Sequence, residues 1–285
     1  MKLKLFVLAL FALLFTGCLG SSGGPGTAEL GVYLTQTAFP SLSLQALGAE
    51  EIREVWVSMA KVTARINGQW VTLLELPADA GEINLKELLF RAQLLGATSI
   101  PAGKLSEIRF ELRENQAGGH LYNYLVFADG RIEPLKLPSR ELKPELNLVI
   151  ARDSAVELVF DVNLDYFAER GSGGYTVNPR KALRFLDSYW QEFASLSATI
   201  ELPPGLGEIL TVELKLLRVG DQHPIWSAEL QDGVLSFQVT SLPAGEYTLE
   251  AAVKLADLAT LTFSSGPFHL EGGTNKQIVL GSRGK

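Results

Sequence analysis

The sequence predicts an all-β protein with two consecutive β-sandwich domains and one or two short helices, after a lipoprotein signal peptide and a flexible tether. Three observations lead to this prediction. Apolar and polar residues alternate with a period of two along many short segments, which is typical of strands with one buried face. The 27 glycines and 13 prolines lie mostly between apolar runs and indicate many turns. The 285 residues are enough for two domains.

The N-terminus predicts export and lipidation. Two lysines precede an apolar run at 5–15, which is too short to span a bilayer, so residues 1–17 are predicted to be a secretory signal peptide. The run Phe15-Thr16-Gly17-Cys18 resembles a lipobox, and we expect Cys18 to become the lipidated N-terminus. Residues 18–26 then form a tether, and the protein stays on the periplasmic or cell-surface side of a membrane. An ordinary signal peptide that contains a cysteine is the alternative.

A first β-sandwich is expected over residues 27–184. From Glu107 onward the segment 104–114 alternates strictly between apolar and charged residues. Within 52–66 the apolar residues change from odd to even positions, which predicts a β-bulge near Ala60 and Lys61. The other expected strands are 29–35, 70–74, 121–127, 147–151, 156–163 and 175–177.

Turns and helices are expected at a few places in this domain. The Asn67-Gly68 pair indicates a turn between strands, and the Asp129-Gly130 pair, which lies between two apolar runs, is a hairpin signal. Residues 99–103 and 241–245 share a similar sequence, Ser-Ile/Leu-Pro-Ala-Gly, and predict the same strand-to-strand corner. One helix is expected over 85–95 after an Asn84 cap, and a second over 180–193.

A second, smaller sandwich is expected over residues 194–285, after a linker or short helix at 185–193. Strands of this length at intervals of about 8–12 residues are typical of a small β-sandwich of about 100 residues. The expected strands are 197–202, 210–219, 225–230, 234–240, 247–255, 267–270 and 276–280.

Seven segments of the first half of the chain have a characteristic order and spacing, at 31–35, 55–62, 70–73, 100–103, 135–139, 160–163 and 175–179. Through them the chain resembles, from about residue 27 to 184, a bacterial lipoprotein family, the domain of unknown function 4382. The family usually has Thr-Asp-Ala-Pro after the first strand, whereas this chain has no aspartate in Thr35-Gln36-Thr37-Ala38-Phe39-Pro40. The resemblance implies a β-sandwich and supplies no catalytic residues.

The last ninety residues are similar, less specifically, to carboxypeptidase-regulatory-like and other immunoglobulin-like modules. The segments that carry this likeness are 233–237, 242–249, 272–273 and 278–280. It implies an accessory or binding module.

Composition excludes several functions. With 25 basic and 32 acidic residues and a net charge of −7, the chain lacks the excess of cations that nucleic-acid binding requires. Its single cysteine excludes an internal disulfide and a cysteine zinc site. The three histidines have neither metal-ligand spacing nor a nucleophile motif beside them. We therefore expect no catalytic residue and no cofactor.

Two groups of residues are candidates for binding. Asp161, Asn163 and Asp165 share one face of an expected strand and could hold calcium, or they could form an ordinary polar strand end. Trp56 alternates with the apolar residues Val55 and Val57, so its side chain is expected on the opposite, outward face of the strand. Together with Tyr122 and Tyr124 it could stack on sugar rings, although packing inside the sandwich is the favoured interpretation of most aromatic residues.

The leading hypothesis is a lipid-anchored module of the cell envelope that binds a glycan or a partner protein without catalysis. A purely structural envelope lipoprotein is the second hypothesis. The third is a polysaccharide hydrolase using paired carboxylates such as Glu111 with Glu114 or Glu50 with Glu51.

Overall fold

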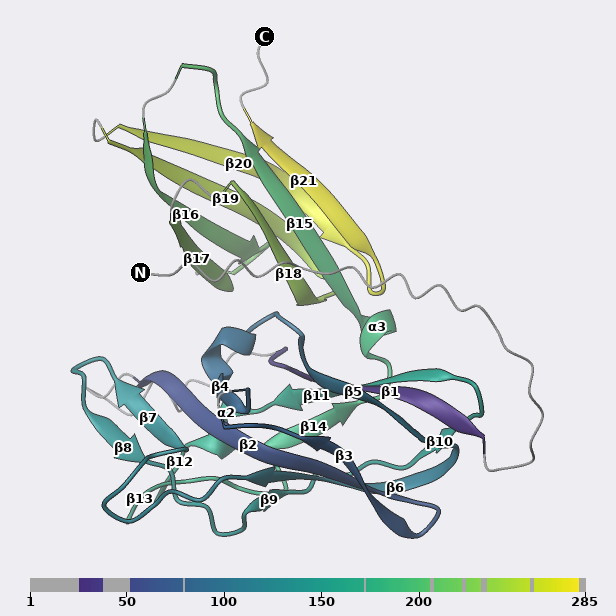
Figure 1. Cartoon of the computed structure of the whole chain (residues 1–285). Coiled ribbons are helices and arrows are strands. Elements are labelled where there is room, and N and C mark those ends of the chain that lie inside the picture. The colour runs from purple at the N-terminus through teal and green to yellow at the C-terminus, as the bar shows by residue number, and fades with distance from the viewer. Residues whose placement is uncertain are drawn as a thin grey trace.

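The computed structural model describes residues 26–37, 52–78, 80–171, 173–205, 208–221, 224–231, 235–256 and 259–281. These residues form an all-β protein with two bodies of sheet, one above the other in Figure 1, and a few very short helices. Two separate clusters of buried apolar side chains fill the two bodies. The all-β fold class expected from the alternating sequence is therefore confirmed.

The first domain is a sandwich of two sheets. The smaller sheet has the order β14-β11-β1-β5, with β1 parallel to β11 and the other pairs antiparallel. Its strands are β1 (Thr27–Thr35), β5 (Gln93–Pro101), β11 (Ala155–Val162) and β14 (Leu183–Leu186). The larger sheet has the order β10-β6-β2-β7-β8, with β3, β4 and β9 attached beside it. Its strands are β2 (Ile52–Ile66), β3 (Gln69–Glu75), β4 (Glu82–Asn84), β6 (Gly103–Leu112), β7 (Tyr124–Phe127), β8 (Ile132–Pro134), β9 (Glu141–Leu142) and β10 (Leu148–Ile150). A separate hairpin pairs β12 (Glu169–Gly171) with β13 (Gly174–Thr176).

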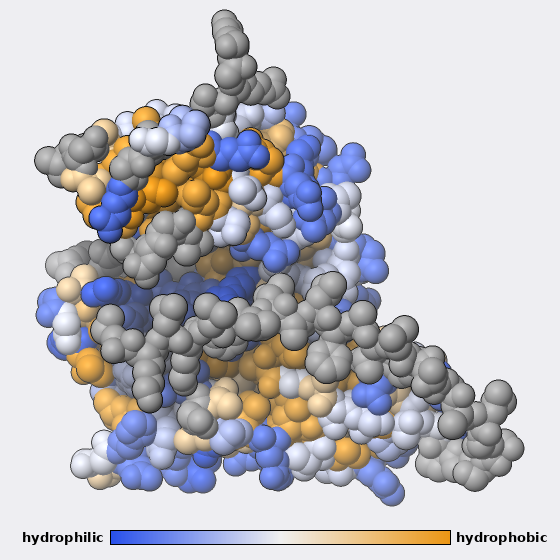
Figure 2. All heavy atoms as spheres, turned by 45° about the horizontal axis from the view of Figure 1, so that its top comes forward, coloured by the Kyte–Doolittle hydropathy of each residue, from blue (hydrophilic) through white to orange (hydrophobic). Residues whose placement is uncertain are grey.

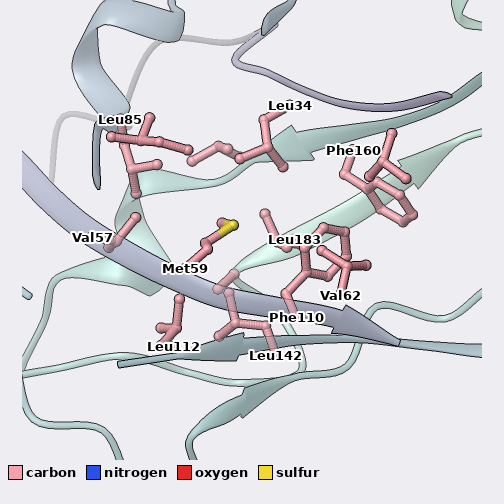
Figure 3. Packing of buried hydrophobic residues seen from close by; sticks show 14 of the residues in the cluster. Leu34, Val57, Met59, Val62, Leu85, Phe110, Leu112, Leu142, Phe160 and Leu183 are labelled. Carbon is pink, nitrogen blue, oxygen red and sulfur yellow. The ribbon is translucent and has the colours of Figure 1, made fainter. Parts of the chain in front are cut away.

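The core of the first domain lies between these sheets, as Figure 3 shows. Leu34 and Phe160 enter it from the smaller sheet, and Met59 and Phe110 enter it from the larger one. All four side chains are fully buried. The rings of Phe110 and Phe160 meet edge to face with centroids 4.9 Å apart, a geometry that aromatic pairs favour. The period-two alternation thus decides which residues fill the sandwich.

The second domain is a smaller sandwich of a three-stranded sheet, β18-β15-β21, and a four-stranded sheet, β17-β16-β19-β20. The three-stranded sheet consists of β15 (Phe193–Glu201), β18 (Ser236–Pro243) and β21 (Asn275–Gly281). The four-stranded sheet consists of β16 (Ile209–Arg218), β17 (Trp226–Gln231), β19 (Gly245–Leu255) and β20 (Thr260–Leu270). Figure 2 shows hydrophobic residues gathered on the visible face of this domain, whose core is flanked by partly buried side chains such as Phe263 and Phe268.

The structure contradicts the predicted extent of both helices. In place of a helix over 85–95, the chain forms one 3₁₀ turn, η1 (Leu85–Leu88), capped by Asn84, and then continues into β5. In place of a helix over 180–193, it forms β14 and the single turn α3 (Tyr189–Glu192). The reason is tertiary, because β5 and β14 find partners in β1 and β11, and such pairing overrides local periodicity. The short helix α2 (Leu164–Phe167) was not expected.

The local irregularities expected from sequence are confirmed. The register of β2 against β6 shifts between Met59 and Lys61, where the switch in parity predicted a bulge. Asn67 and Gly68 join β2 to β3 with φ values of 50° and 82°, and the Asp129-Gly130 pair joins β7 to β8. Both Ser-x-Pro-Ala-Gly corners carry the chain from one sheet of a sandwich to the other, from β5 to β6 and from β18 to β19.

The two domains meet at a buried junction built around the loop between η1 and β5. Phe90 in this loop is 2% exposed and belongs to the hydrophobic cluster of the second domain. Its carbonyl oxygen accepts hydrogen bonds from the N–H groups of Thr240 (2.8 Å) and Ser241 (3.3 Å) in β18. The Oγ of Ser241 lies 2.7 Å from Oγ1 of Thr35 and 2.6 Å from the hydroxyl of Tyr189. The junction therefore joins β1, this loop, α3 and β18.

Candidate functional site

Two aromatic rings lie side by side on the outer face of the larger sheet in the first domain. Trp56 in β2 is the pairing partner of Tyr124 in β7. Their neighbours Val55, Val57 and Leu125 are buried, so the alternation of both strands turns the two rings away from the core. The rings are near parallel, with an interplanar angle of 18° and centroids 6.2 Å apart. A parallel pair at this distance is offset, which leaves part of each ring face uncovered by the other.

Two carboxylates, those of Glu54 and Glu82, lie beside this Trp56–Tyr124 pair. The indole Nε1 of Trp56 donates a hydrogen bond to Oε2 of Glu54 at 2.6 Å, which orients the ring. Glu82 lies on β4 and pairs with Ser58 of β2. Its side chain is therefore on the same face of the sheet as that of Trp56. Burial, reinforced by the charges of Glu82 and Glu54, raises the pKa of Tyr124. The pair is therefore an apolar surface with hydrogen-bond acceptors at its edge.

A buried asparagine holds this part of the sheet in place. Asn123, which is fully buried, accepts a hydrogen bond at Oδ1 from the N–H of Ser58 and donates one from Nδ2 to the carbonyl of Arg113. Asn115 in turn accepts at Oδ1 from the N–H of Asn123 at 2.8 Å. These bonds tie the start of β7 to β2. Neither asparagine nor the flanking glutamates were expected as site residues, although Glu54 is two positions from Trp56 and so shares its face.

Tyr122 does not join the aromatic pair. It precedes β7, which begins at Tyr124, and its ring meets His120 edge to face with centroids 4.5 Å apart. Its N–H donates to Oδ1 of Asn115 at 2.8 Å. A strand was expected over 121–127, which would have placed Tyr122 and Tyr124 on one face, but residues 122–123 form a bend and the strand begins only at Tyr124.

The predicted calcium residues are engaged in other contacts. Oδ1 of Asp161 accepts hydrogen bonds from the backbone N–H and Oγ1 of Thr37 at 2.8 and 2.9 Å, and its Oδ2 accepts one from Arg184 Nη2 at 2.8 Å. Asn163 caps α2 by accepting a hydrogen bond from the N–H of Asp165. Across the described part of the chain, no three His, Cys, Asp or Glu side chains gather as metal ligands would. Calcium binding stays a prediction, and these contacts weigh against it.

The remaining candidates are placed as follows. Glu114 forms an ion pair with Arg140, and Glu111 in β6 pairs with Glu141 in β9. Cys18, the signal peptide and the Glu50-Glu51 pair lie outside the described residues. Within those residues no helix has the length and apolar character needed to cross a membrane.

With this geometry in view, the chain can be compared with known proteins. Residues 27–179 match the model of a family described as domain of unknown function DUF4382. The chain belongs to the DUF4382 family. The DUF4382 match covers more than half of the chain and contains the Trp56–Tyr124 pair, Asp161 and the loop that carries Phe90. The resemblance expected from the ordered motifs is confirmed.

No curated protein matches the chain. Among solved structures, it is similar to a leucine-rich repeat protein from Bacteroides thetaiotaomicron, with 12% identity, 90% of this chain and 26% of that chain covered, and a TM-score of 0.22. The TIE protein of Bacillus anthracis shows 12% identity, coverages of 89% and 33%, and a TM-score of 0.21. A Bacteroides ovatus protein assigned to cell adhesion shows 10% identity, coverages of 90% and 92%, and a TM-score of 0.27. The chain spans about a quarter to a third of the length of the first two, and TM-scores this low support no transfer of fold or function.

Proposed function

We propose that this DUF4382 protein is a non-catalytic binding module of the cell envelope, anchored by lipid at Cys18, which binds a glycan through the Trp56–Tyr124 pair. The observation that carries the proposal is the offset, near-parallel arrangement of these two rings on the outer face of the sheet. The sequence around Cys18 supports the anchor, because a short apolar run followed by a lipobox-like segment is typical of exported lipoproteins.

The chemistry of the pair suits a sugar ring. The face of a pyranose carries several C–H groups, which pack on the electron-rich face of an aromatic ring. The carboxylates of Glu54 and Glu82 can accept hydrogen bonds from sugar hydroxyl groups at the edge of the pair. Because these carboxylates are negative, a neutral glycan is favoured over an acidic one at this surface.

Binding to an array of envelope and plant glycans tests this function. The chain from Thr27 to Lys285 should retain a neutral glycan, and changing both Trp56 and Tyr124 to alanine should weaken binding about tenfold or more, which corresponds to about 1.4 kcal/mol.

Trp70→Ala is the matched control. Trp70 is 45% exposed, but the guanidinium of Arg109 lies 4.0 Å from its ring centroid, so its face is already occupied. Equal loss in the Trp70 variant, or binding of no glycan by the unchanged chain, would count against the proposal. The second outcome would favour a purely structural role in the envelope.

The lipid anchor is tested separately in cells fed a labelled fatty acid. The unchanged chain should carry label and sediment with membranes. The Cys18→Ser variant should carry none and should leave the membrane fraction. Membrane association that persists without label in this variant would contradict the anchor while leaving glycan binding open to its own test.

A further inference from the structure

A pocket of about 660 Å³ at one end of β11 and β14 is lined by three positively charged side chains. Its volume lies within the range of about 300–1,000 Å³ that is usual for ligand sites. Arg180, Lys181 and Arg184 contribute the cations, and Tyr166 of α2 and Phe185 of β14 are among the other lining residues. We call this the cationic pocket. It lies where β14 pairs with β11 in the smaller sheet (Figure 1), whereas the Trp56–Tyr124 pair belongs to the larger sheet.

An ion pair with a buried carboxylate orients one of these cations. Asp161 and Arg184 are direct pairing partners between β11 and β14, and one guanidinium nitrogen donates to Oδ2 of Asp161 at 2.8 Å. Asp161 is 6% exposed, whereas the side chain of Arg184 is 66% exposed. The charge of Asp161 is therefore compensated inside the protein. The remaining guanidinium donors of Arg184 have no further partner among the described residues.

The other two cations are uncompensated. Neither Arg180 nor Lys181 forms an ion pair with a carboxylate in the part of the chain that the structure describes. The ammonium of Lys181 lies 5.1 Å from the ring centroid of Tyr166, which places it over an aromatic face. Glu145 is the only carboxylate besides Asp161 among the residues described as lining the pocket. Three cations thus face two carboxylates, a local positive excess in a chain whose net charge is −7.

We propose that the cationic pocket binds a ligand that carries several carboxylates, such as an oligomer of a uronic acid. Guanidinium groups bind carboxylates with two parallel hydrogen bonds, and Lys181 adds a third positive charge over the ring of Tyr166. The same positive excess disfavours calcium, for which Asp161 would also have to give up Thr37 and Arg184. This site is independent of the proposed neutral-glycan surface, where Glu54 and Glu82 disfavour an acidic ligand.

Isothermal titration calorimetry on the full chain, purified in detergent, tests the proposal. The probe is trigalacturonate, and the matched ligand is its methyl ester, in which the carboxylates are neutral. Trigalacturonate should bind with an affinity that falls as salt is added, and the ester should bind at least about tenfold more weakly.

Variants locate the site. Arg180→Gln combined with Lys181→Gln should weaken binding of trigalacturonate about tenfold or more. Arg152→Gln with Lys254→Gln makes the same change of charge at exposed positions outside the pocket and should leave the affinity unchanged. Changing Trp56 and Tyr124 to alanine should also leave it unchanged, which separates this site from the glycan surface proposed above.

Several results would overturn the proposal. Equal binding of the methyl ester would show that the carboxylates are not recognised, and equal binding of inorganic phosphate would reduce the pocket to a general anion patch. Equal loss in the two double variants would show only an effect of total charge. A calcium-dependent rise in melting temperature that disappears in Asp161→Asn would restore the metal hypothesis in its place.

Discussion

Asp161 shows how the role of a single residue depends on its neighbours in space. Its spacing from Asn163 and Asp165 suggested a calcium site on one face of a strand, but the fold places Thr37 and Arg184 beside it. One carboxylate oxygen then holds Thr37, just after β1, and the other holds an arginine on β14. The same aspartate thereby becomes part of the lining of the cationic pocket.

Tyr33 should show an unusual titration. Its hydroxyl donates a hydrogen bond to Oε1 of Glu157 at 2.9 Å, and burial, this bond and the charge of Glu157 raise its pKa from 10.0 to about 12. Since the pKa is higher in the folded state, the stability that Tyr33 contributes is complete below pH 10. It is lost as the pH rises from 10 to about 12.

The measurement is a nuclear magnetic resonance titration of ring-labelled tyrosine, assigned by loss of the signal in Tyr33→Phe. In Glu157→Gln the pKa of Tyr33 should fall but stay above 10.0, because its burial remains. An ordinary pKa for Tyr33 in the unchanged protein would show that the hydroxyl does not face Glu157.

At the scale of elements, β2 organises the larger sheet. Its first half pairs with β7 and β4, and its second half pairs with β6 and β3. The register shift between Met59 and Lys61 lies where the strand changes partners. A β-bulge increases the local twist of a strand, and here it lets one strand serve two sets of neighbours. The Trp56–Tyr124 pair is positioned by the first of these halves.

Gly81→Ala should disturb the joint between β2 and β4. A Cβ at position 81 would lie 2.0 Å from the carbonyl oxygen of Met59, and the N–H of Met59 donates to the carbonyl of Gly81 at 2.8 Å. Because the contact is with backbone, the strand must move, and we expect a loss of about 1–3 kcal/mol in the free energy of unfolding.

Urea denaturation measures this loss. Gly119→Ala is the control, since a Cβ there would meet the Gln116 side chain at 3.1 Å, with the nearest backbone atom at 3.9 Å. A Gly81 variant as stable as the unchanged chain would mean that β4 does not approach β2 as described.

At the scale of the whole molecule, the junction makes one domain depend on the other. Phe90 belongs to the first domain in sequence but fills the core of the second, and its backbone has a φ of 53°. A positive φ is unfavourable for a residue with a large side chain, so docking against β18 has to hold it there. The buried contact between Thr35 and Ser241 adds a second link across the same surface.

The two domains are therefore expected to unfold together. Calorimetry of the intact chain should show a single unfolding transition. Phe90→Ala should lower the free energy of unfolding by about 3–5 kcal/mol and separate this transition into two. Leu94→Ala, on the neighbouring strand at 49% exposure, should have little effect. Two transitions in the unchanged chain would show that the junction does not couple the domains.

The sequence by itself determined the all-β class, the buried face of most strands, the bulge in β2 and the hairpin turns. These features depend on neighbouring residues, because side chains alternate along a strand and turns need particular φ values. It also indicated that Trp56 faces outward, because the parity of Val55 and Val57 decides this locally.

Only the tertiary structure decided the rest. The strands β5 and β14 replaced expected helices because β1 and β11 offered them backbone partners. Tyr124 and Glu82 came to lie beside Trp56, Arg184 met Asp161, and Phe90 entered the second core, in each case through pairing or packing between segments distant in the chain. The physical reason is that strand pairing and core packing act between residues remote in sequence, and local periodicity carries no information about which partner a segment will meet.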